Sequence, residues 1–161
     1  MPGRPTNYST VIPAARTAAE CQQLLADAGA SSVAVHYDNR EPSGLSFRLD
    51  TPHGPRAFTL PVDVAGAAAV LAVMLRDNPP RGASRAALDK MATRKRAADV
   101  AWRVARDWLE ATLALVAAGM ASITQAMLPY VHVDADRTLW EAYRDNEQAA
   151  IEAGGADAEP S

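Results

Sequence analysis

Three runs of alternating apolar and polar or small residues in the first half of the chain constrain its fold most. Val33, Val35 and Tyr37 form the first run, and the same alternation recurs over 45–50 and 57–62. Successive side chains of a strand point to opposite faces of a sheet, so each run predicts a strand with one apolar face. Short segments rich in Gly, Pro, Asn and Ser separate the runs, which favours three consecutive antiparallel strands.

The residues that flank these strands predict further elements. Tyr8–Ile12 is a short β-rich run, and 17–28 has the capping signature and Gly stop of a helix. Asp63 is placed to cap a helix over 64–76 that is apolar nearly all round. We therefore expect an α+β fold whose first module, residues 8–76, has the order β-α-β-β-β-α, an antiparallel sheet with helices on one face.

The second half predicts helices. Residues 77–84 contain Pro-Pro and Gly and are expected to be a linker. The helical region spans 85–152 and begins with one long helix up to about Ala118, followed by a short helix capped by Ser122 and a last helix capped by Thr138. The last helix is expected to fold back on the long one as a C-terminal helical hairpin.

Composition places the chain among ordinary globular proteins. Of its 161 residues 48% are hydrophobic and 22% charged. The start of the sequence lacks the apolar stretch of a secretion signal, and the longest apolar runs are too short to span a bilayer. We expect a soluble protein of the cytoplasm with no membrane partner, with disordered ends at 1–7 and 153–161. Cys21 is the single cysteine, so an intramolecular disulfide and a cysteine zinc cluster are excluded, and no cofactor is expected.

Charge is distributed unevenly along the chain. Residues 1–80 carry 6 basic and 7 acidic side chains, 81–106 carry 8 and 2, and 107–161 carry 2 and 10, giving −1, +6 and −8. Part of the positive charge forms i, i+4 pairs with acids on the same helix. The remainder defines the basic cluster, a candidate nucleic-acid-binding site: Arg81, Arg85, Lys90, Arg94, Lys95 and Arg96. Either the acidic last helix neutralises this cluster or an external anion does.

Three groups of side chains suggest further chemistry. His132, Asp134 and Asp136 would share one face of an extended segment, as metal ligands do, although a polar loop explains them as well. His36 with Asp38, and His53 in its turn, could supply acid–base groups or be an exposed strand histidine and a turn histidine. The tryptophans, which are Trp102, Trp108 and Trp140, could stack on bases, but their positions on apolar stripes favour a helix-packing core in which Trp108 is central.

Residues 102–111, followed by Leu113 to Val116, Gly119-Met120 and Leu128-Pro129-Tyr130, resemble a segment of a family of small uncharacterised proteins from tailed bacteriophages and prophages. The resemblance extends to Leu45 to Arg48 and Phe58 to Val62, and covers most of residues 8–145. It implies a phage or prophage origin and a bacterial host cytoplasm. It supplies no activity and no site residues.

These features lead to one functional hypothesis and two alternatives. The first is a non-catalytic phage-type accessory binding protein whose partner is a nucleic acid or a host or phage protein. The alternatives are a small metal-dependent hydrolase or nuclease that uses the His132 segment, and a protein–protein interaction or inhibitor module. The apolar helix 64–76 and the second apolar flank of the long helix, which includes Val104, exceed what a thin sheet covers, so a homodimer is also expected.

Overall fold

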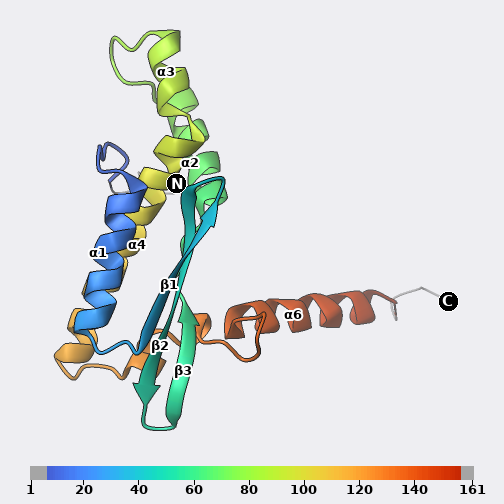
Figure 1. Cartoon of the computed structure of the whole chain (residues 1–161). Coiled ribbons are helices and arrows are strands. Elements are labelled where there is room, and N and C mark those ends of the chain that lie inside the picture. The colour runs from blue at the N-terminus through green and yellow to red at the C-terminus, as the bar shows by residue number, and fades with distance from the viewer. Residues whose placement is uncertain (1–6, 157–161) are drawn as a thin grey trace.

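The computed structural model describes residues 7–156, except for the side chains of Met91 and of 154–156, and has the expected α+β class (Figure 1). Its helices and strands, in chain order, are α1 (Ala14–Asp27), β1 (Ser32–Asp38), β2 (Glu41–Thr51), β3 (Gly54–Thr59), α2 (Val64–Asp77), α3 (Arg85–Met91), α4 (Arg94–Ala117), α5 (Ile123–Ala126), the 3-10 helix η1 (Leu128–Tyr130) and α6 (Leu139–Ala156). The expected succession of three strands, and of the helices around them, is confirmed.

The sheet is antiparallel, with its strands in the order β1-β2-β3. Asn39 and Arg40 form the β1–β2 turn with φ values of 49° and 68°, a left-handed pair that matches the twist of a two-residue hairpin. Because this turn is so short, β2 begins at Glu41, before the expected start of that strand. Strand β3 ends at Thr59, ahead of Pro61, as expected for a residue that has no N–H to donate.

The expected strand at Tyr8–Ile12 is wrong. These residues form turns, one of them closed by a hydrogen bond of 2.9 Å from the Thr10 N–H to the Asn7 carbonyl. The carbonyls of Tyr8 and Thr10 accept from the Arg96 guanidinium instead of from a neighbouring strand. Val11 is 84% exposed, so the segment has no buried apolar face that would pair it with the sheet.

Helix α1 begins earlier than its sequence predicts. It starts at Ala14, and its first N–H donates to the Asp99 carboxylate of α4 at 2.8 Å. The capping group is thus 85 residues away in sequence. The expected capping residue, Thr17, is instead buried inside the helix.

The expected long helix over 85–118 is interrupted, which corrects the helical region. Helix α3 ends at Met91, and Thr93 begins α4 by accepting a hydrogen bond of 3.3 Å from the Arg96 N–H. The expected fold-back of the last helix is also wrong. Helix α6 extends away from the body of the molecule and reaches Ala156, within the tail that was expected to be disordered (Figure 1). The rest of that tail, and residues 1–6 of the expected disordered start, lie outside the described residues.

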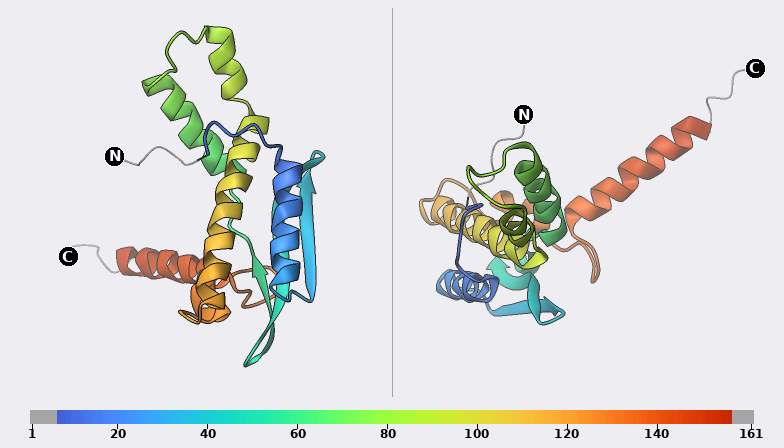
Figure 2. Two further views of the ribbon diagram at one scale, coloured as in Figure 1. Left: turned by 90° about the vertical axis from the view of Figure 1, so that its left-hand side faces the viewer. Right: turned by 90° about the horizontal axis from the view of Figure 1, so that it is seen from above.

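The core lies between one face of the sheet and the helices α1 and α4, which run side by side over it (Figure 2). Trp102 of α4 is fully buried there, and its indole N–H donates to the Pro42 carbonyl at 2.9 Å. Trp108 is half-buried and meets the Tyr130 ring edge to face at 5.4 Å. Trp140 is 50% exposed and stacks on Tyr143. The packing role expected of the tryptophans therefore belongs chiefly to Trp102, and the central position expected of Trp108 is wrong.

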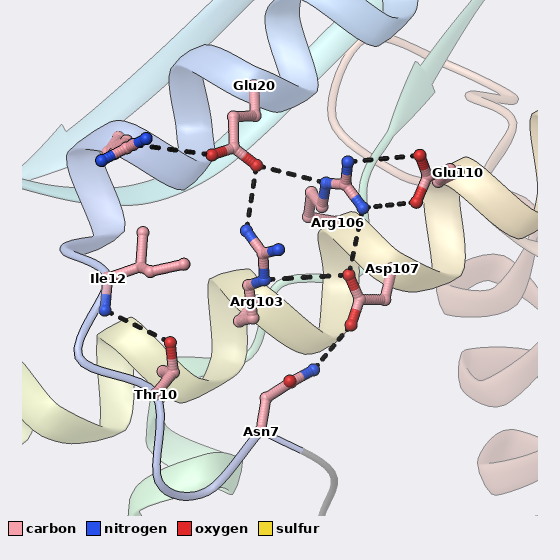
Figure 3. A network of polar contacts seen from close by, with 9 residues as sticks. Asn7, Thr10, Ile12, Glu20, Arg103, Arg106, Asp107 and Glu110 are labelled. Atoms are coloured by element: carbon pink, nitrogen blue, oxygen red, sulfur yellow. Dashed lines mark hydrogen bonds and ion pairs between the residues drawn. The ribbon is translucent and has the colours of Figure 1, made fainter.

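A network of charged side chains joins α1 to α4 along the edge of the core (Figure 3). The Glu20 carboxylate of α1 lies 2.9 Å from Arg103 and 3.3 Å from Arg106, both on α4. Arg103 and Arg106 also reach Asp107, and Arg106 pairs with Glu110. Asn7 closes the network by donating to Asp107 at 2.6 Å. The two helices are thereby tied together at the rim of their contact.

Within residues 7–156 no helix combines the length and the apolar run that crossing a membrane requires.

Replacing Trp102 should unfold the protein far more readily than replacing Trp140. Trp102→Ala removes a fully buried ring and its hydrogen bond to Pro42, and we expect it to lower the free energy of unfolding by about 3–5 kcal/mol. Trp140→Ala removes a half-exposed ring and should change it by less than about 1 kcal/mol in the monomer. Urea denaturation followed by far-UV circular dichroism measures both, and equal losses would contradict this core.

Candidate nucleic-acid interface

The basic cluster lies on a protrusion that we call the arm: the C-terminal half of α2, the loop 78–84, α3 and the first turn of α4. Figures 1 and 2 show α2 and α3 rising together beyond the end of the sheet. The loop brings Arg81, α3 contributes Arg85 and Lys90, and the first turn of α4 contributes the other three cations of the cluster. All six predicted residues therefore lie on the arm.

Four of the six cations face solvent and form no ion pair with the described residues. Arg81, Arg85, Lys90 and Lys95 are exposed, and none of them forms an ion pair with a side chain of residues 7–156. Of the two acids near these cations in sequence, Asp77 is paired with Arg76 at 2.9 Å, and Asp89 of α3 forms no ion pair within residues 7–156. Uncompensated cations that project from a surface attract polyanions.

The other two cations have structural roles. Arg94 pairs with Asp38 at the end of β1, at 3.2 Å. Arg96 is half-buried, and its guanidinium donates to the carbonyls of Thr10 and Tyr8. These contacts fix the base of the arm to the sheet and to the segment before α1, so Arg94 and Arg96 are less available to a ligand than the sequence suggests.

No local sequence signal separates Arg96 from Lys95, because both precede the same buried run, 97–102, of α4. The inward position of Arg96 is set by the carbonyls of Thr10 and Tyr8, which lie 86 and 88 residues earlier in the sequence.

The acidic last helix does not neutralise the cluster within one chain. Helix α6 leaves the body near η1, at the end of α4 that is remote from α3, and points away from the arm (Figure 1). The expectation that the last helix neutralises the cluster is therefore not met within one chain.

The His132 segment forms a tight loop in which the side chains of His132 and Asp134 have hydrogen-bonding partners. His132 Nε2 shares a hydrogen bond of 2.6 Å with the Thr59 hydroxyl. The Asp134 carboxylate accepts from the Arg137 guanidinium at 2.8 Å and 3.0 Å and from the N–H groups of Asp136 and Arg137. The Arg137 guanidinium is the main reason that the pKa of Asp134 is lowered. Throughout residues 7–156 no three His, Cys, Asp or Glu side chains converge as a metal site would require.

The remaining acid–base candidates are not brought together. His36 bonds to Ser46 across the sheet at 2.9 Å, and Asp38 is paired with Arg94. His53 lies in the β2–β3 turn, where its N–H donates to the Thr51 hydroxyl. Each of these side chains has a local structural explanation.

Comparison with protein-family models, with curated proteins and with solved structures gave no match to this chain. Its function is therefore inferred from the geometry of the arm.

The contacts of the His132 segment predict that it binds no divalent metal. Because Arg137 already neutralises Asp134, millimolar Mg²⁺, Mn²⁺ or Zn²⁺ should leave the melting temperature unchanged, and His132→Ala should not alter that result. Differential scanning fluorimetry checks the shift, and elemental analysis of the purified protein checks for bound metal. A stoichiometric metal that is lost in His132→Ala would restore the hydrolase or nuclease alternative.

Proposed function

We propose that this protein is a non-catalytic accessory protein that binds nucleic acid through the arm. The observation that carries the proposal is the set of exposed cations, Arg81, Arg85, Lys90 and Lys95, that have no acidic partner among the described residues. Arginine guanidinium groups form bidentate contacts with phosphate, and lysine supplies a point charge.

The form of the arm suits a sequence-independent contact. Its exposed cations are distributed over the loop 78–84, the two ends of α3 and the first turn of α4, so they can meet successive phosphates of one backbone. No aromatic side chain lies among residues 78–96, which leaves nothing to stack on bases. Binding should therefore be weak and governed by counterion release.

The proposal includes a phage or prophage origin and action in the bacterial host cytoplasm. Both are supported by the resemblance of residues 102–111 and the segments around them to small phage proteins. The absence of a catalytic role is supported by the structural bonds of His36, Asp38, His132 and Asp134.

A salt titration of binding to duplex DNA tests the arm directly. With about four phosphates neutralised, the slope of log K against log salt should be about −3 to −4. Changing Arg81, Arg85 and Lys90 together to Gln removes three of these charges, and we expect the slope to fall to about −1.

The matched control changes three exposed arginines that are remote from the arm. Arg48 and Arg56 lie toward the β2–β3 turn, and Arg144 lies on α6. Changing these three to Gln alters the net charge equally but should leave the slope within about 0.5 of the parent value. No binding by the parent at low salt, or an equal loss of slope in both variants, would refute the proposal.

A further inference from the structure

An apolar groove runs along the side of α4 that the sheet does not cover. It has a volume of about 420 Å³ and lies between α2 and α4, with Tyr130 near one end. Ala67 and Val70 line one wall, and Val104 and Trp108 line the other. Val70 is 47% exposed and Val104 37%, although both lie within apolar surroundings. This groove is large enough to receive side chains from another helix.

Helix α6 carries the complementary surface. Trp140, Tyr143 and Ile151 lie toward one side of this helix and are 50%, 56% and 69% exposed. Few contacts link α6 to the rest of the chain beyond η1 at its base, and no α6 residue lines the groove. A helix that exposes two stacked aromatic rings and an isoleucine leaves its apolar stripe largely uncovered by the described part of its own chain.

The base of α6 is held so that this stripe does not reach the groove of the same chain. The His132 N–H donates to the Ala57 carbonyl of β3, and the Leu139 N–H donates to the Val131 carbonyl, both at 2.8 Å. Thr138 and Glu141 form a reciprocal capping box, and Arg137 bridges Asp134 to Asp145. These bonds set the direction in which α6 leaves the body, away from α2 and α4 (Figure 2).

We propose that α6 docks into the α2–α4 groove of a second copy of this chain, so that two copies exchange their last helices. One sequence then supplies both halves of a self-complementary interface, which a two-fold axis closes. The aromatic pair Trp140 and Tyr143 would fill the groove beside Val104 of the other copy.

Charge favours the same occupant. Helix α6 contains four carboxylates and one arginine, whereas the groove leads along α4 toward the basic end of that helix, where Arg94, Lys95 and Arg96 lie. The α6 helix of a second copy would therefore bring negative charge toward the positive side of the molecule, and like charges would be kept apart.

Sedimentation velocity at about 50 µM tests the proposal, since this concentration populates dimers of micromolar affinity. We expect the parent to be dimeric. Val104→Glu in the groove, and Trp140→Ala with Tyr143→Ala on α6, should each raise the dimer dissociation constant at least tenfold. Met120→Glu is the control, because Met120 is 73% exposed and lies outside both surfaces. A monomeric parent, or a dimer that neither variant weakens, would overturn the proposal.

Cross-linking identifies the surfaces that meet. A chain with Val104→Cys is mixed with one that carries Tyr143→Cys, and a short bismaleimide is added. Cys21 is buried, and burial raises the pKa of its thiol to about 12, so it should not react in the folded protein. We expect a cross-linked pair of one chain of each kind. Equal cross-linking when Met120→Cys replaces Val104→Cys would refute this docking geometry.

Discussion

The rest of the structure depends on the covering of α4 from more than one side. The sheet covers Trp102, α1 covers the neighbouring alanines, and α2 packs along a further flank. A single helix can be covered on several sides only if its neighbours approach closely, and Ala97, Ala98, Ala101 and Ala105 of α4 allow that approach. One strip of α4, marked by Val104, is left open. The groove is therefore a consequence of the same packing that forms the core.

The charged network at the α1–α4 contact determines how α1 is positioned on α4 more than it adds to the free energy of unfolding. The Arg103 and Arg106 side chains are 21% and 19% exposed, and ion pairs at this depth retain solvent screening, so each contributes about 0–1 kcal/mol. Arg106 Nε lies 3.3 Å from Glu20 but is not aligned for a hydrogen bond. Two guanidinium groups facing one carboxylate nevertheless fix the sliding position of α1 along α4, because any other position would leave a partly buried charge unpaired.

The sequence predicted the elements that residues close together in the chain determine. It did not predict the features that depend on contacts between residues far apart in the chain. Strand alternation and the capping residues Asp63, Ser122 and Thr138 were sufficient to find the sheet and three helix starts. The cap of α1 could not be found in this way because its donor and acceptor, Ala14 and Asp99, are far apart in sequence. The projecting α6 was missed for the same reason: its direction is set by bonds from the loop 131–138 to β3, whereas its apolar stripe alone suggests packing on α4. In the candidate site, the residue types identified the cluster, but the backbone carbonyls that occupy Arg96 are visible only in the structure.

Helix α4 also keeps the cations of the arm apart from the acids of α6. Arg94 at its start lies 14 residues before Trp108, whose contact with Tyr130 marks the base of α6, so these positions are about 21 Å apart, about twice the screening length of about 8–10 Å in physiological salt. The cations of the arm therefore receive little compensation from the α6 helix of their own chain. Under the two proposals above, a nucleic acid would contact the exposed end of the arm, and the acidic α6 of another copy would approach its base. Because the outer cations, Arg81 and Arg85, lie beyond the groove in which α6 would dock, the two kinds of partner can occupy different parts of the same positive surface.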